Sequence, residues 1–323
     1  MVSTRLLLLA AACALSLSTI ACGDSDGSIV PEGAHHGYVV SSLLMPVDQD
    51  QARMYGLDLG ASKSSTPDDI VDNRLGEAFG ILDTMGLAIQ PRLETAIIEG
   101  GIILLVDFQT KDFMNASAAG LSVTFGTNPV PAACTDANDR ICGHHLTGTA
   151  MFSIASDSPK DELIAGEIVN GTFNGGPGDL SLQISFGTPQ PITLRLVNAR
   201  AKATAITDTG MTALLGGALT VNDLNTQILP VIQAQVAEIV ALQCAGATPP
   251  NCTCTSGDPT GMNLLTLFDT GTKDCKISLE EITGNPVVQF LLAPDICSSK
   301  ACTAPDSLSL GIKITTVKAT FPM

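Results

Sequence analysis

Four acidic residues form the part of the chain whose residue types and spacing best fit metal binding. They are Asp269, Asp274, Glu280 and Glu281. Calcium takes about six to eight oxygen ligands, and a bidentate glutamate commonly completes its coordination. We therefore expect Asp269 as the first ligand, Asp274 in the middle of the site, and one of the two glutamates at its end. No other bound cofactor is expected.

The segment 267–282 that carries these carboxylates resembles an EF-hand. It has an apolar lead-in, an acidic loop, a central Ile277 and glutamates on the expected exit helix. It departs from the motif because Gly271 stands at the third ligand position, the turn glycine is replaced and Lys273 adds a positive charge. Counted back from Ile277, the loop is also one residue too long. The alternative is that a disulfide at Cys275 closes the loop in place of calcium.

Eight cysteines follow residue 22, and an even number in an exported chain favours disulfide bonds. They are Cys134, Cys142, Cys244, Cys252, Cys254, Cys275, Cys297 and Cys302. Short spacings predict the local pairs Cys134–Cys142 and Cys297–Cys302, and the other four would form two pairs whose connectivity stays open. A zinc site at Cys252-Thr-Cys254 is the alternative, but its spacing is not C-x-x-C, and export favours oxidation.

Two Asp-Thr-Gly triplets, at Asp208 and Asp269, match the motif that aspartic proteases use for their paired aspartates. They lie too close in the sequence to come from two matched lobes. The second triplet also belongs to the EF-hand-like loop. A protease active site is therefore not expected.

The four histidines occur as two adjacent pairs, His35-His36 and His144-His145. Neighbouring side chains on a strand face opposite ways, so one such pair is poorly suited to chelate a metal. The sequence also lacks G-x-S-x-G, H-E-x-x-H and the phosphate-binding Gly-Lys-Ser/Thr pattern. We therefore expect no catalytic residues and no enzymatic activity.

The first 21 residues are typical of a signal peptide. Arg5 precedes the apolar run 6–15, and the segment Thr19-Ile-Ala-Cys22 resembles the lipobox of bacterial lipoproteins, apart from Thr19, where Leu is usual. The resemblance implies that Cys22 carries palmitate-type acyl chains after cleavage and anchors the protein to a membrane. An ordinary secretory peptide is the alternative. Residues 22–37 are expected to be a tether in the cell envelope, with the outer membrane as the favoured location.

The composition limits the kinds of partner. Lys and Arg total 16 against 32 Asp and Glu, a net charge of −16, and such a surface repels nucleic acid. Aromatic residues make up 4% and Trp is absent, so base-stacking platforms are not expected. Hydrophobic residues make up 45%, enough for a substantial aliphatic core.

Period-two alternation dominates the elements expected to position these residues. The predicted strands are 102–108, 121–125, 180–186, 192–196 and 307–314, with a glycine-rich turn at 171–178. Helices are predicted at 66–82, capped by Thr66, at 93–99, and from Asn222 to Cys244 with a kink at Pro230. The apolar positions of 192–196 and 308–312 coincide, which suggests two strands of one sheet with an insertion between them; chance similarity is the alternative.

The predicted fold class is α+β, a mostly antiparallel β-sheet or sandwich with a disulfide-rich helical insert. The expected divisions are a β-rich domain at 38–210, a helical, cysteine-rich insert at 211–305 and a returning strand at 306–323.

The chain as a whole resembles predicted lipoproteins of unknown function from myxobacteria. The similarity lies in the segments 170–182, 267–282, 291–295 and 306–311. It implies an envelope location and no known activity. The function expected from the sequence is a lipid-anchored structural or binding protein without catalysis. The alternatives are a calcium-dependent binding module and a carrier that buries a lipid between the sheet and the 222–244 helix.

Overall fold

The computed structural model describes residues 29–60, 68, 70–136, 138–185, 191–299 and 301–323. The predicted signal peptide, the acylation site Cys22 and residues 22–28 of the predicted tether lie outside these residues. The rest of the predicted tether is described, and its last four residues, 34–37, belong to the first strand of the fold. The proposed helix cap at Thr66 also lies outside them.

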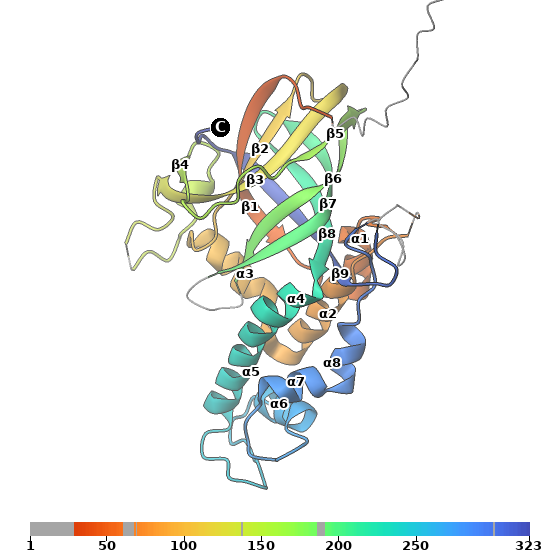
Figure 1. Cartoon of the computed structure of the whole chain (residues 1–323). Coiled ribbons are helices and arrows are strands. Elements are labelled where there is room, and N and C mark those ends of the chain that lie inside the picture. Colours follow the sequence, from red (N-terminus) through yellow and green to blue (C-terminus); the bar gives the residue numbers. More distant parts are fainter. Residues whose placement is uncertain (1–28, 61–67, 69, 137, 186–190, 300) are drawn as a thin grey trace, which may run out of the picture.

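Eight antiparallel strands close into a barrel (Figure 1). Their order around the ring is β2-β1-β9-β8-β7-β6-β5-β3, and β3 pairs back to β2, while β4 extends the sheet outside the ring on β3. The strands are β1 Ala34–Leu44, β2 Leu104–Thr110, β3 Ala116–Val130, β4 Met151–Ile154, β5 Ile164–Val169, β6 Thr172–Ile184, β7 Ile192–Thr207, β8 Gly210–Thr220 and β9 Ser307–Lys318.

The mostly antiparallel α+β class is confirmed, but the sheet is a closed barrel and not a sandwich. Closure depends on β1, which pairs with β9 on one side and β2 on the other. Alternating strands look the same in the sequence for both architectures, because each has one buried face. The predicted strands 192–196 and 307–314 do belong to one sheet, with β8 between them.

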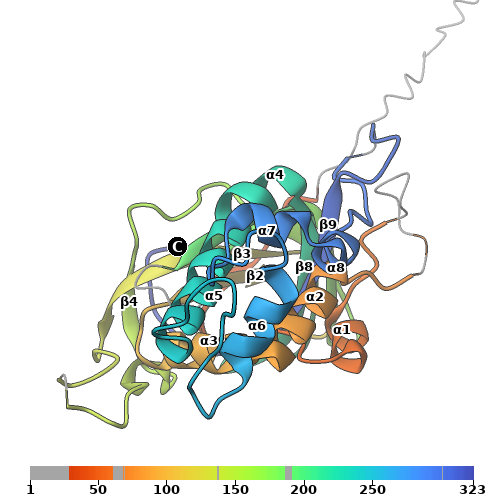
Figure 2. The same ribbon diagram turned by 90° about the horizontal axis from the view of Figure 1, so that it is seen from below.

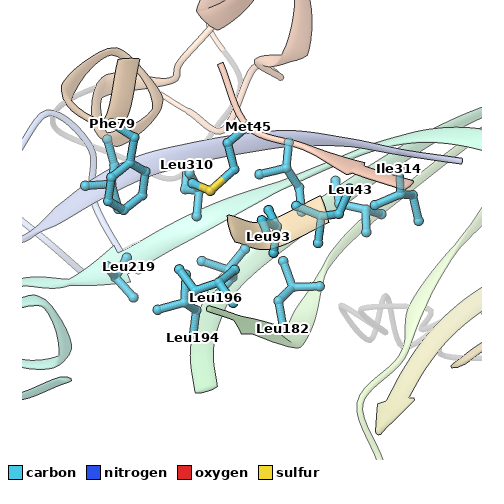
Figure 3. Packing of buried hydrophobic residues seen from close by; sticks show 14 of the residues in the cluster. Leu43, Met45, Phe79, Leu93, Leu182, Leu194, Leu196, Leu219, Leu310 and Ile314 are labelled. Atoms are coloured by element: carbon cyan, nitrogen blue, oxygen red, sulfur yellow. The ribbon is translucent and has the colours of Figure 1, made fainter. Parts of the chain in front are cut away.

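Alternating aliphatic side chains fill the barrel interior (Figure 3). β6, β7 and β9 contribute Leu182, Leu194, Leu196, Leu310 and Ile314, each at most 2% exposed. Burying a side chain of this size contributes about 2 kcal/mol, so the period-two pattern largely determines the core. Phe79 and Leu93 from the helices join the same cluster at one end of the barrel.

Helices gather at that end of the barrel (Figures 1 and 2). They are α1 Gln49–Tyr55, α2 Arg74–Leu82, α3 Ile89–Ile98, α4 Val221–Asp223, α5 Leu229–Gln243, α6 Thr260–Phe268, α7 Leu279–Gly284 and α8 Pro286–Leu291, with π-helical turns η1 Asp83–Leu87 and η3 Leu224–Ile228 and the 3-10 turn η2 His144–Leu146. No helix in the described part of the chain is both long enough and apolar enough to cross a membrane.

Helix α2 starts later than predicted, at Arg74, because Asn73 is its cap. The Asn73 side-chain oxygen accepts N–H bonds from Gly76, at 3.2 Å, and from Gly311, at 2.8 Å. Its amide nitrogen donates to the carbonyl oxygens of Gly311 and Ala52, both at 2.9 Å. One buried side chain therefore caps the helix and fixes it to strand β9.

The helical segment also begins later than the expected boundary at 211, because residues 210–220 form β8. Thr220, and not Asn222, caps the first helical turn through its side-chain oxygen. The expected single helix is divided by η3, and α5 begins after it with Pro230 in its first turn. Proline is tolerated there because the first N–H groups of a helix have no partner within the helix.

The predicted glycine-rich turn at 171–178 is wrong. The β5–β6 turn is confined to Asn170 and Gly171, both with positive φ, which suits a two-residue hairpin turn. The following residues belong to β6, whose register shifts near Gly178. A Cβ at Gly178 would lie 2.3 Å from the Leu163 carbonyl oxygen, so this glycine permits a close strand approach.

A candidate binding groove beside helix α5

A groove of about 940 Å³ lies between helix α5 and the loop that joins α6 to α7. Its size falls within the range of about 300–1,000 Å³ that is typical of small-molecule sites. Helix α5 contributes Ala237, Val240 and Ala241 to one wall. The loop and the start of α7 contribute the other wall, whose charged members are Asp274, Lys276, Glu280 and Glu281.

The wall on α5 leaves room for a ligand because the residues that face the groove are small. Val236 and Val240 are buried against the rest of the helical end, while Ala237 and Ala241 are more exposed along the groove. An alanine at each of these positions leaves space that a longer side chain would occupy. This wall has a signal in the sequence, because Ala237, Ala241 and Ala245 recur at every fourth residue. These alanines are not among the site residues predicted from the sequence.

Two disulfides hold the groove together. Cys244, directly after α5, is bonded to Cys254, and Cys252 is bonded to Cys275 in the opposite wall. The Cys252–Cys275 bond therefore ties the segment after α5 to the α6–α7 loop. Because both Cys252 and Cys254 are bonded to other cysteines, neither sulfur is a free thiolate for the alternative zinc site.

The remaining cysteines form the two local pairs that were predicted, Cys134–Cys142 and Cys297–Cys302, with Cα–Cα distances of 4.5 and 5.6 Å. All eight cysteines after residue 22 are therefore in disulfides.

Asp269 organises the loop from the inside. It lies at the end of α6, 6% exposed, and its carboxylate accepts the backbone N–H groups of Asp274, at 3.2 Å, and Cys275, at 2.9 Å. Its own N–H donates to the carbonyl oxygen of Leu265. Both carboxylate oxygens thus accept hydrogen bonds from loop amides, so the Asp269 side chain itself holds the shape of the loop.

The other predicted ligands have separate contacts. Glu281 accepts the N–H of Ser278 at 2.9 Å and its own N–H donates to the Ser278 hydroxyl, which forms a capping box for α7. Asp274 accepts the N–H of Lys276 at 3.0 Å, and Glu280 is exposed. Within the described ranges, no three His, Cys, Asp or Glu side chains are grouped so that they could hold a metal ion.

A hydrogen bond joins the two walls of the groove. The Gln233 side chain on α5 donates to the carbonyl oxygen of Ile277 at 2.8 Å. Ile277 itself is 2% exposed and packs into the core. This hydrogen bond therefore ties helix α5 to the loop that carries the carboxylates of the groove.

The two Asp-Thr-Gly triplets and the first histidine pair are not brought together. Asp208 lies in the β7–β8 turn, at the barrel end opposite the helices that hold Asp269, and it approaches His36 at 3.4 Å. His35 contacts a different carboxylate, Asp107, at 2.8 Å. The first histidine pair thus points in two directions, as expected for neighbours on a strand.

The second histidine pair is divided in the same way. His144 contacts Asp139 at 3.1 Å, whereas His145 is fully buried with its ring near that of Phe152. Burial lowers the pKa of His145, and the neighbouring His144 lowers it further, while the Ile97 backbone opposes the shift.

The apolar space between α5 and the barrel end is small. A cavity of about 30 Å³ is lined by aliphatic and aromatic side chains of α2, η3, α5 and α8, among them Phe79, Ile228, Ile232 and Leu291. This volume corresponds to roughly one water molecule. A lipid chain would therefore need the helices to move apart, and the groove is the larger of the two spaces.

Comparison of the chain with known proteins identifies no relative. No family model, no curated protein and no solved structure matches this chain. The groove is therefore interpreted from its own chemistry, which combines an apolar helix face with exposed carboxylates in a disulfide-bonded frame.

Proposed function

We propose that the protein is an exported lipoprotein, anchored to the cell envelope through acyl chains on Cys22, that binds a ligand in the groove beside α5 without catalysis. The lipobox-like sequence Thr19–Cys22 supports the anchor. The four disulfides support maturation in an oxidising compartment, and they use all eight cysteines that follow Cys22. The resemblance to myxobacterial lipoproteins supports the same location.

The groove is the observation that carries the binding role. Ala237 and Ala241 offer apolar contact along one wall, and the other wall carries three carboxylates and one lysine. This arrangement favours a ligand that combines apolar surface with positive charge, such as a cationic amphipathic peptide. The two disulfides and the Gln233–Ile277 hydrogen bond hold the walls in place before the ligand arrives, which reduces the entropy lost on binding.

The anchor is tested by mass analysis of the mature amino terminus. An acylated Cys22 and recovery of the protein with membranes are expected, and Cys22→Ser should release the protein into the soluble fraction. An unacylated amino terminus in native material would refute the proposed anchor.

The groove is tested with a fluorescent peptide of alternating Leu and Lys, and a Leu–Glu peptide serves as the matched probe of opposite charge. We expect only the cationic peptide to bind, and Ala241→Phe to weaken binding about tenfold, which corresponds to about 1.4 kcal/mol. Ala234→Phe is the control, because Ala234 is exposed on α5 outside the groove lining. Equal binding by both variants, or equal binding of both peptides, would contradict the proposal.

A further inference from the structure

We infer that the barrel end opposite the helices rests on the lipid bilayer, with Val30, Met114 and Val169 in the interfacial layer. The inference rests on the acylation of Cys22 proposed above and adds the orientation of the folded body on the membrane. It is carried by the place where the chain enters the barrel and by the side chains exposed there.

The strand register defines this end of the barrel. β1 begins at Ala34, opposite Thr110, where β2 ends, and the hairpin turn between Val169 and Thr172 lies at the same end. The chain enters here, because the Glu32 N–H donates to the Ala118 carbonyl oxygen of β3 at 3.2 Å. The helices cover the other end (Figure 1).

The distance from the acylation site is short. Seven residues, 23–29, lie between Cys22 and Val30. Even fully extended, the eight Cα–Cα steps from Cys22 to Val30 span about 28 Å. An acyl anchor on Cys22 therefore keeps this end of the barrel close to the headgroup layer, whereas the helical end has no such constraint.

Apolar side chains project from this end. Val30 is 73% exposed, Met114 is 57% exposed and Val169 is 47% exposed. Exposed aliphatic side chains beside an acyl anchor are suited to the interfacial layer, where their burial adds to the affinity of the acyl chains.

The loop that displays Met114 is built by its neighbours. The Asp112 carboxylate accepts the N–H groups of Met114, at 2.5 Å, and of Asn115, at 3.1 Å. The Met114 carbonyl oxygen accepts the Gly171 N–H at 2.9 Å, which joins this loop to the β5–β6 turn beside Val169. Met114 and Val169 thus belong to adjoining turns at one edge of the barrel.

Several charged groups near this end are paired. Lys111 binds Glu32, and His35 and His36 approach Asp107 and Asp208. Of these contacts, the Lys111–Glu32 ion pair loses less hydration free energy than two isolated charges would when it approaches a medium of low dielectric constant. With this end on the bilayer, the groove at the helical end faces away from the membrane.

The chain contains no Trp, so a single introduced Trp reports its own surroundings. The acylated protein is reconstituted into phosphatidylcholine vesicles with brominated acyl chains, as Met114→Trp, Val169→Trp or Leu242→Trp. Leu242 is the control, since it is 74% exposed on α5 at the helical end. We expect the first two variants to lose about half of their fluorescence and to emit at shorter wavelength, with no change for the third.

The outcomes separate the two proposals. If the protein does not float with the vesicles, the acyl anchor is absent, and both the proposed anchor and the proposed orientation are refuted. If it floats but the tryptophans introduced at positions 114 and 169 are quenched no more than the control, the anchor stands and the proposed orientation is overturned.

Discussion

Replacing Asp72 with Asn is expected to stabilise the protein at neutral pH. The pKa of the Asp72 carboxyl group is raised from 3.8 to about 6, mainly by burial. The negative charges of Asp295, Asp68 and Asp58 contribute to this rise, and a hydrogen bond from the Leu59 N–H, at 2.8 Å, partly opposes it. The ionised side chain is therefore unfavourable in the folded protein at pH 7.

A pKa rise from 3.8 to about 6 corresponds to about 3 kcal/mol. Because the side chain is partly exposed, solvent screening reduces the expected effect to about 1–2 kcal/mol. Between these two pKa values the folded state binds more protons than the unfolded state. The contribution of Asp72 to stability is thus fully present below about pH 3.8 and is lost as the pH rises through about 6.

Asn is neutral at every pH and keeps an oxygen that can accept the Leu59 N–H. In urea unfolding, Asp72→Asn should raise the unfolding free energy by about 1–2 kcal/mol at about pH 7.5 and by little at about pH 4. Asp157→Asn, at an exposed turn, is the matched control and should show no such gain. An Asp72→Asn protein that is no more stable than wild type at about pH 7.5, or that gains equally at both pH values, would refute this reasoning.

Three further results are expected. Burial lowers the pKa of His145 below its ordinary value of 6.5, so the wild type should lose stability as the pH falls below about 6.5. The melting temperature of His145→Phe, relative to that of the wild type, should therefore rise between about pH 7.5 and pH 5. A melting-temperature difference that does not change with pH would argue against this. Replacing Cys252 and Cys275 with Ser should cost about 3 kcal/mol in urea unfolding, since the bond spans 23 residues of sequence, and an unchanged midpoint would contradict it. Asp269→Ala should cost about 1–3 kcal/mol by leaving two loop amides without an acceptor, and calcium should not shift the wild-type melting temperature; a calcium-dependent rise would favour the EF-hand alternative.

The sequence predicted the parts of the structure that depend on local patterns. Alternation at 180–186, 192–196 and 307–314 identified strands, because a half-buried strand needs an apolar residue at every second position. The two short-range cysteine pairs were also predicted, because few residues separate their members. The pairing of the other four cysteines depends on where α5 places Cys244 relative to the α6–α7 loop.

The errors arose where a distant contact outweighs a local signal. The glycines at 171–178 suggested a turn, but Gly178 lies within β6, where the strand passes close to Leu163 and leaves no room for a side chain. The cap of α2 is Asn73 and not Thr66, because Asn73 also bonds to Gly311 on a strand far away in the sequence. Neither contact has a signature in the local sequence.

The sequence by itself determined that segments such as 180–186, 192–196 and 307–314 form strands and which of their residues face the core, because a half-buried strand alternates with period two. The even number of cysteines after residue 22 likewise indicated that they would pair. Only the tertiary structure decided that the sheet closes into a barrel, because closure requires β1 to pair with β9 from the opposite end of the chain. It also decided how the carboxylates of the EF-hand-like loop are used: Asp269 binds loop amides, Glu281 caps a helix and Glu280 lines a groove. Residue spacing alone does not specify these hydrogen-bond partners.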